Sequence, residues 1–287
     1  MKLAKWFGAA AVAVAVLGLA ACGASNKESG NGKDKTVTIK IGTMTIDNDE
    51  QQRWDLIQKK LEKENVKLEF TQFTEYPQVN KAVADGELDV NAFQHYYYLN
   101  NWNKENNQDL VAIADTYIAP IRLYSGTKDG KNKYKKVNEL PDGAEIAVPN
   151  DATNESRALN LLQAAGLIKL DKSGNELATV ANVKENPKKL KITELDASQT
   201  ARSLTSVDAA VVNNTFVTEA KIDFKKALFV EPKDKNSKQW FNIIAAKKDW
   251  EKSPKADAIK KIIKAYHTDE VKKVVDETSD GLDQPVW

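Results

Sequence analysis

One arginine lies where it could bind a carboxylate. Arg157 belongs to the segment 148–157, which runs from the end of an expected strand into an expected helix. In the first turn of a helix, the helix dipole disfavours a cation. A bound carboxylate would remove this conflict, because it could pair with the guanidinium and with free backbone N–H groups together. The alternatives are an ordinary surface arginine and, for the neighbouring Asn154, a residue that only caps the helix.

An aromatic cluster could enclose an uncharged side chain. Phe93, His95 and Tyr98 belong to the run Phe93-Gln94-His95-Tyr96-Tyr97-Tyr98, and Tyr76 could add another wall. Such rings would form an apolar slot with polar rims. An aromatic edge beside a thioether contributes about 0.3–1.5 kcal/mol. The same run could equally be a packed loop that covers the sheet.

Asparagines at two further places could bind the polar groups of the same ligand. Asn213 and Asn214 follow the apolar segment 207–212, at a strand end where crevice ligands bind but where turn residues are also common. Asn242 is a polar residue inside the apolar segment 240–244. A buried amide needs partners, and the ammonium or carboxylate of a ligand could be one.

Catalytic and metal-binding motifs are missing from the sequence. It contains no Gly-x-Ser-x-Gly, His-Glu-x-x-His, Gly-x-x-x-x-Gly-Lys or Gly-x-Gly-x-x-Gly. Cys22 is the only cysteine, and His95 and His267 are the only histidines, so an internal disulfide and a thiolate-rich metal site are excluded. We expect His95 to be a structural hydrogen-bond donor and His267 to lie on the surface. We therefore expect no metal, no cofactor and no enzymatic activity.

The charges are balanced. The 287 residues include 42 basic and 41 acidic side chains, which gives a net charge of +1. This balance supplies no electrostatic attraction to nucleic acid or to an anionic membrane surface. We expect no nucleic-acid partner.

Alternating strand and helix patterns would position these residues. Apolar patterns typical of strands fall at 37–41, 66–70, 88–93, 145–148, 190–195, 207–212 and 241–246. Helical spacing is found around 54–61, 158–165 and 259–266. Asn65 is suited to a left-handed conformation after the first helix, and Gly166 to ending the second. This order predicts an α/β architecture with mostly parallel sheets.

Two extended segments that contain prolines, 117–120 and 229–232, look like crossings between lobes. If both cross, residues 36–117 plus 232–287 form lobe 1 and residues 118–231 form lobe 2. A two-lobed α/β chain of this kind has a cleft between its lobes, where a ligand binds.

The N-terminal region predicts export and a lipid anchor. A short basic start precedes 14 uncharged residues, 7–20, too few to span about 30 Å of hydrocarbon but typical of a secretory signal. Leu19-Ala20-Ala21-Cys22 resembles a bacterial lipobox, in which the chain is cut before the cysteine and the sulfur is acylated. We expect a cleaved signal peptide at 1–21, and lipidated Cys22 with a flexible tether at 22–35. The alternative is a cleaved signal with a chance cysteine nearby.

Several long segments together resemble one known family, over essentially the whole chain after the tether. They are 84–95, Tyr98-Leu99, 148–151 with Thr153-Asn154, Arg157-Ala158-Leu159, 160–168 and 207–213. In this order they resemble the NlpA/MetQ type of methionine-binding lipoproteins, the substrate-binding components of methionine ABC importers.

The resemblance implies a two-lobed periplasmic-binding-protein fold (type II-like), in which two crossing strands join the lobes and the ligand binds between them. Arg157 would clamp the carboxylate of an amino acid with Asn154 beside it, and the other site residues would hold its polar groups or line its side-chain pocket. The ligand-binding residues predicted in this way are Tyr76, Phe93, His95, Tyr98, Asn154, Arg157, Asn213 and Asn242.

The resemblance also implies a role and a location. The protein would be lipid-anchored on the extracytoplasmic face of the cell membrane, touching the membrane through its anchor only. It would capture L-methionine, with D-methionine as a second candidate, and deliver it to an ABC permease and its ATPase subunit. Because this chain has no nucleotide-binding loop, ATP hydrolysis would come from the partner.

Three departures from the family pattern keep other ligands open. Thr43-Met44-Thr45-Ile46-Asp47 stands where Gly-Pro is expected, and Tyr97 and Ala152 stand where prolines are usual. The first of these segments would face the cleft. A methionine-containing dipeptide or another small apolar amino acid is therefore an alternative ligand. A surface adhesin or scaffold is an alternative of a different class.

Overall fold

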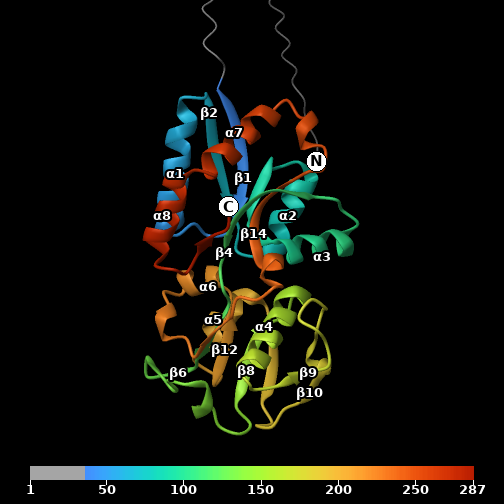
Figure 1. The fold of residues 1–287 in the computed structure, drawn as a ribbon, viewed down its shortest axis with the longest axis vertical. Helices are drawn as coiled ribbons and strands as arrows, with labels where there is room; N and C mark the ends of the chain where they lie inside the picture. The colour runs from blue at the N-terminus through green and yellow to red at the C-terminus, as the bar shows by residue number, and fades with distance from the viewer. Residues whose placement is uncertain (1–35) are drawn as a thin grey trace, which may run out of the picture. The chain divides into compact units, whose positions relative to one another are not determined.

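Two mixed β-sheets, each covered by helices, make up the part of the chain that the structure describes, residues 36–287 (Figure 1). The structure is a computed structural model. The predicted signal peptide, the tether and Cys22 lie outside the described residues.

The first sheet has six strands in the order β15-β4-β14-β3-β1-β2. Its strands are β1 (Val37–Thr43), β2 (Val66–Gln72), β3 (Val90–His95), β4 (Val111–Ile118), β14 (Phe241–Ala246) and β15 (Gln284–Pro285). Its helices are α1 (Asn48–Glu62), α2 (Tyr76–Asp85), α3 (Tyr96–Asn106), α7 (Ala256–Tyr266) and α8 (Asp269–Ser279).

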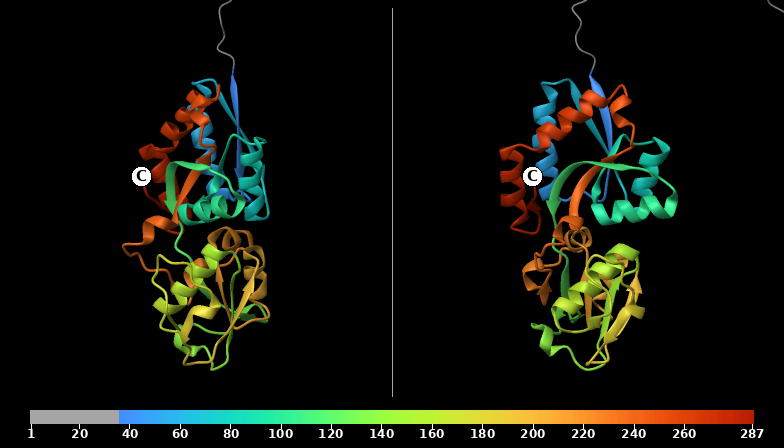
Figure 2. Two further views of the ribbon diagram at one scale, coloured as in Figure 1. Left: turned by 90° about the vertical axis from the view of Figure 1, so that its right-hand side faces the viewer. Right: turned by 45° about the vertical axis from the view of Figure 1, so that its right-hand side comes forward.

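The helices cover both faces of this sheet because its strands carry apolar side chains on both sides. In β14, Ile244 packs with residues of α1, α7 and α8, whereas Ile243 packs with residues of α2 and α3. Adjacent residues of a strand point to opposite faces, so these two groups of helices lie on opposite sides. The left view of Figure 2 shows α7 and α8 in red on one side and α2 and α3 in teal on the other.

The second sheet has five strands in the order β11-β8-β12-β5-β13. Its strands are β5 (Arg122–Ser125), β8 (Glu145–Pro149), β11 (Lys191–Leu195), β12 (Ala209–Val212) and β13 (Phe229–Val230), and its helices are α4 (Ala152–Ala164), α5 (Ala197–Ser203) and α6 (Asn214–Glu219). All four residues of β12 are fully buried, with Val211 in one core cluster and Val212 in another. The sequence-based expectation that this strand is covered on both faces is confirmed.

Short elements complete the fold. The short strands are β6 (Thr127–Lys128), β7 (Lys131–Asn132), β9 (Lys169–Leu170) and β10 (Val183–Glu185), and the 3-10 turns are η1 (Val137–Glu139), η2 (Val180–Asn182), η3 (Phe224–Lys226), η4 (Ser237–Trp240) and η5 (Trp250–Lys252). Among residues 36–287, no helix is long and apolar enough to cross a membrane.

The chain passes between the sheets at the two predicted segments. It leaves the first sheet after Ile118 and enters the second at Arg122, then leaves the second after Val230 and returns at Phe241. The two crossings pair with each other, since the Glu231 N–H donates to the Ile121 carbonyl at 3.0 Å. The lobe bounds that the sequence gives, 36–117 plus 232–287 and 118–231, stay a prediction.

The expectation of mostly parallel sheets is wrong. Parallel pairs join β1 to β2 and β3, and β8 to β11 and β12, but β14 lies antiparallel to both β3 and β4. The reason is the return crossing, which brings β14 into the first sheet from the end nearer the second. β5 and β13 are likewise antiparallel to their neighbours.

Candidate functional site

A cleft between the two sheets holds the candidate site. Its walls come from the ends of strands and helices of both sheets. All eight residues predicted to bind a ligand line it, namely Tyr76, Phe93, His95, Tyr98, Asn154, Arg157, Asn213 and Asn242.

One end of the cleft is walled by aromatic rings. Tyr76 begins α2, Phe93 lies in β3 and Tyr98 lies in the first turn of α3, and the ring centroids are 5.8–6.0 Å apart. Phe216 of α6 does not line the cleft but packs against Tyr76, with the ring centroids 5.4 Å apart. Burial raises the pKa of the Tyr76 and Tyr98 hydroxyls, so both stay neutral. This wall suits an apolar side chain.

The sequence left open that the run 93–98 is a packed loop, and this alternative is wrong. The run spans the end of β3 and the start of α3, with His95 at the boundary. Tyr96 and Tyr97 do not line the cleft. The Tyr96 hydroxyl donates to Asp115 at 2.7 Å, and the Tyr97 hydroxyl donates to the Asn175 carbonyl at 3.4 Å.

The start of α4 differs from the expectation in two respects. Asp151, not Asn154, caps the helix, because the Asp151 carboxylate accepts the Asn154 backbone N–H at 3.0 Å. Arg157 is the sixth residue of the helix and so lies in its second turn, where the predicted conflict with the helix dipole is weak. Because Asp151 caps the helix, the Asn154 side chain is available to line the cleft.

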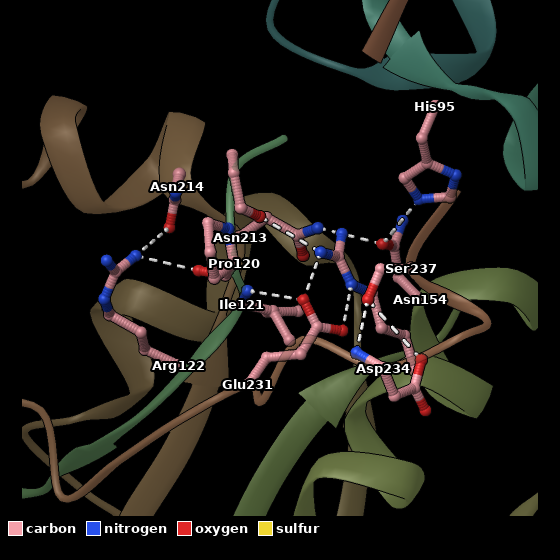
Figure 3. A network of polar contacts seen from close by, with 12 residues as sticks. His95, Pro120, Ile121, Arg122, Asn154, Asn213, Asn214, Glu231, Asp234 and Ser237 are labelled. Atoms are coloured by element: carbon pink, nitrogen blue, oxygen red, sulfur yellow. Dashed lines mark hydrogen bonds and ion pairs between the residues drawn. The ribbon is translucent and has the colours of Figure 1, made fainter. Parts of the chain in front are cut away.

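A chain of hydrogen bonds links Asn154 to residues of both sheets (Figure 3). Its Nδ2 donates to the Asp151 carboxylate at 2.9 Å. Its Oδ1 accepts from the Asn213 amide at 2.9 Å. Oδ1 also lies 3.3 Å from Nε2 of His95, on the first sheet. The amide orientation of Asn154 is therefore fixed by partners on three sides.

His95 is a neutral donor in this chain. Its Nδ1 accepts the Tyr98 backbone N–H at 3.0 Å, so the ring proton is on Nε2, which faces Asn154. Burial, with the positive charge of Arg157 nearby, lowers the pKa of His95 to about 3. The expected role as a structural donor agrees with this geometry.

Arg157 is held by the protein along one edge. It is 3% exposed, its Nε donates to Oε1 of Glu231 at 2.7 Å, and its Nη2 donates to Oε2 of Glu231 and to the Ala119 carbonyl. Its guanidinium carbon lies 4.7 Å from the centroid of the Trp240 ring. Nη1 has no hydrogen-bond partner within residues 36–287, and Arg157 lines the cleft. This nitrogen is free for a ligand.

Asn213 offers a matching acceptor. Its Nδ2 is used by Asn154, whereas its Oδ1 is buried and has no partner among the described residues. An unpaired buried acceptor is costly, and a bound donor would relieve that cost. Asn242 lies opposite His95 in the β14–β3 pairing and completes this end of the cleft.

Sequence reasoning missed three residues that build the site. Asp151 orients Asn154, Glu231 pairs with Arg157, and Trp240 packs against both Arg157 and His95. The sequence could have indicated Glu231, because it is the one charged residue of the predicted crossing 229–232. No group of three or more His, Cys, Asp or Glu side chains in the described part of the chain could hold a metal ion.

The pKa of His95 predicts an acid-sensitive fold. A histidine that is neutral when folded contributes stability fully above the unfolded pKa of about 6.5, and this contribution is lost as the pH falls toward the folded value. Between pH 7.5 and pH 5, the wild type should lose roughly 4–8 °C more in Tm than His95→Gln, without ligand. Differential scanning calorimetry at both pH values tests this, and equal losses for the two proteins would contradict it.

The fold and the cleft define a two-lobed substrate-binding protein of the α/β class. Residues 39–287 match the model of the NlpA lipoprotein family, and the chain belongs to that family. The family resemblance predicted from the sequence is confirmed.

Known proteins agree with this assignment. The chain is 39% identical to the D-methionine-binding lipoprotein MetQ of Escherichia coli K12, over 77% of this chain and 78% of that one. The crystal structure of the substrate-binding protein of a methionine transporter from Streptococcus pneumoniae is 74% identical, with a TM-score of 0.85 over 87% of this chain and 96% of that one. A nutrient-binding protein from Burkholderia cenocepacia, bound to methionine, is 39% identical with a TM-score of 0.77, over 87% of this chain and 100% of that one.

Proposed function

We propose that this protein binds methionine in the cleft and delivers it to an ABC importer. One observation carries the proposal: the same cleft contains a free nitrogen of Arg157, an unpartnered oxygen of Asn213 and a wall of aromatic rings. An amino acid with an apolar side chain presents a carboxylate, an ammonium and an apolar tail. These are the three groups that this end of the cleft can accept.

Each group of the ligand would have its own partner. The carboxylate would accept from Nη1 of Arg157, and the ammonium would donate to Oδ1 of Asn213. The thioether would lie among Tyr76, Phe93 and Tyr98, where each aromatic contact with sulfur contributes about 0.3–1.5 kcal/mol. Methionine therefore fits better than a branched or charged side chain.

Contacts across the cleft support binding with exclusion of water. His95 meets Asn154, the Tyr97 hydroxyl reaches the Asn175 carbonyl, and the Asn214 amide donates to the Leu282 carbonyl at 3.3 Å. In each pair, one residue belongs to the part of the chain that forms the first sheet and the other to the part that forms the second. Polar contacts with the ligand are stronger in an enclosed site than in open water.

The role is binding, not catalysis, in this proposal. The Streptococcus pneumoniae relative is described as the substrate-binding protein of a methionine transporter, and the Escherichia coli relative as a D-methionine-binding lipoprotein. A permease would receive the ligand and a separate ATPase subunit would supply the energy. The acylated Cys22 would keep the protein on the extracytoplasmic face of the membrane, as the lipoprotein relatives suggest. These comparisons favour transport over the adhesin or scaffold alternative.

Calorimetry with a ligand panel tests the proposal. We expect binding of L-methionine or D-methionine. We expect at least tenfold weaker binding of 3-(methylthio)propylamine, which lacks the carboxylate, and of N-acetylmethionine, which lacks the ammonium, because a hydrogen bond to a charged group contributes about 1.5–3 kcal/mol. A methionyl dipeptide that binds more tightly than methionine would reassign the ligand. No response to any methionine compound would refute the proposal.

A further inference from the structure

We propose that Glu231 is a positioning residue for ligand binding: it orients Arg157 toward the carboxylate without touching the ligand. This inference rests on the proposed function, since it concerns how the same cleft holds a carboxylate.

Glu231 pairs with the edge of Arg157 that the ligand does not need. Its two carboxylate oxygens accept from Nε and Nη2 of Arg157 in the bidentate arrangement typical of arginine–carboxylate pairs. The side chain of Glu231 is 13% exposed, and Glu231 is not among the residues that line the cleft, whereas Arg157 is. Figure 3 shows Glu231 well separated from His95, which does line the cleft. The Glu231 carboxylate therefore occupies the Nε and Nη2 edge of the guanidinium, and Nη1 remains for the ligand.

Glu231 is itself fixed to both crossings. Its backbone N–H donates to the Ile121 carbonyl at 3.0 Å, and its Oε2 accepts the Ile121 N–H at 3.2 Å. Ala119, on the same crossing as Ile121, accepts Nη2 of Arg157 at 3.0 Å. The guanidinium of Arg157 is thus bound to a carbonyl from one crossing and a carboxylate from the other, and its orientation is set by the segments that join the two sheets.

Trp240 restricts the remaining freedom. Its ring lies against the guanidinium of Arg157 at 4.7 Å, and it also meets the His95 ring edge-on at 5.1 Å. A long flexible side chain loses conformational entropy when it is ordered by a ligand, so a side chain ordered in advance binds more tightly. Glu231 on one edge and Trp240 on one face of the guanidinium order Arg157 in advance in this way.

A competing account makes the opposite prediction. Glu231 could instead neutralise Arg157 and compete with the ligand carboxylate, in which case its removal would strengthen binding. The two contacts with Ile121 favour the positioning role, because they hold the Glu231 carboxylate beside Arg157 through hydrogen bonds of the protein itself.

The experiment compares two ligands in Glu231→Gln. Glutamine has the same shape but presents an N–H₂ group to the guanidinium, so Arg157 loses its fixed orientation. We expect the Kd of L-methionine to rise about tenfold or more, while the Kd of 3-(methylthio)propylamine changes less than about twofold. A purely structural role would weaken both ligands equally.

Matched variants complete the design. Asp89→Asn makes the same chemical change in a partly buried ion pair with Lys255, outside the residues that line the cleft, and should leave both Kd values unchanged. Glu231→Asp keeps the charge but is too short for the bidentate contact, so it should give the same selective loss, which keeps the test decisive if Glu231→Gln does not fold. Unchanged or tighter methionine binding by Glu231→Gln, or an equal loss for both ligands, would overturn the inference. Failure of the wild type to bind methionine would instead overturn the proposed function.

Discussion

Arg157→Ala should increase the Kd of methionine by a factor between about 30 and several thousand. Truncating one partner of a buried, hydrogen-bonded charge pair costs about 2–5 kcal/mol, and each 1.4 kcal/mol is a factor of ten in affinity. The loss falls on the carboxylate, because Nη1 is the nitrogen of Arg157 that the protein leaves free within residues 36–287. Isothermal titration calorimetry with L-methionine measures the effect.

The variant also leaves Glu231 without its partner, and stability must be separated from affinity. An uncompensated buried carboxylate destabilises a fold by about 3–5 kcal/mol. The double variant Arg157→Ala/Glu231→Gln removes that charge and should recover thermal stability without recovering binding. Arg202→Ala removes an exposed arginine of α5 and should bind as the wild type does. Methionine binding by Arg157→Ala with wild-type affinity would exclude the clamp.

Local patterns predicted many of the elements well. The expected strand 241–246 has the bounds of β14, whose apolar residues are interrupted only by Asn242 and end before Lys247. Gly166 ends α4 with φ +73°, and Asn65 takes a left-handed φ of 55°, as their residue types favour. Two expected strands begin two residues late, at Val90 and Ala209, because a pattern of side chains does not say which backbone groups find ladder partners.

The family pattern predicted eight residues that line the cleft, but it did not predict the contacts between distant segments. Asp151 and Asn154 are both good capping residues, and only the observed backbone decides that Asp151 takes the cap. The Arg157–Glu231 pair joins residues 74 positions apart, so no spacing rule could have found it.

His267 illustrates the same limit. It was expected on the surface, but it is partly buried, since the Trp287 ring stacks on it at 5.5 Å and its Nε2 lies 2.7 Å from the Asp115 carbonyl. Both partners come from parts of the chain that are remote or terminal. Their approach depends on the folded sheet and not on the local sequence.

Cys22→Ser should move the protein from the membrane fraction to the soluble fraction. Each buried methylene of an acyl chain contributes about 0.8 kcal/mol, and one chain alone holds a protein only marginally, whereas two hold it stably. Serine lacks the thiol that a lipobox-type reaction acylates. Because the 14 uncharged residues before the cysteine are too short to span about 30 Å of hydrocarbon, they should not replace the anchor.

Metabolic labelling with a fatty-acid analogue, followed by membrane fractionation, distinguishes lipidation from other forms of attachment. Wild type and Ser25→Ala, a hydroxyl change three residues away, should both carry the label and sediment with membranes. Cys22→Ser should carry no label, and its methionine affinity should equal that of the wild type, because the described residues that line the cleft all lie after the tether. Label on Cys22→Ser, or its retention in the membrane fraction, would show that the anchor is not this cysteine, whereas lost affinity would show that the N-terminal region contributes to the cleft.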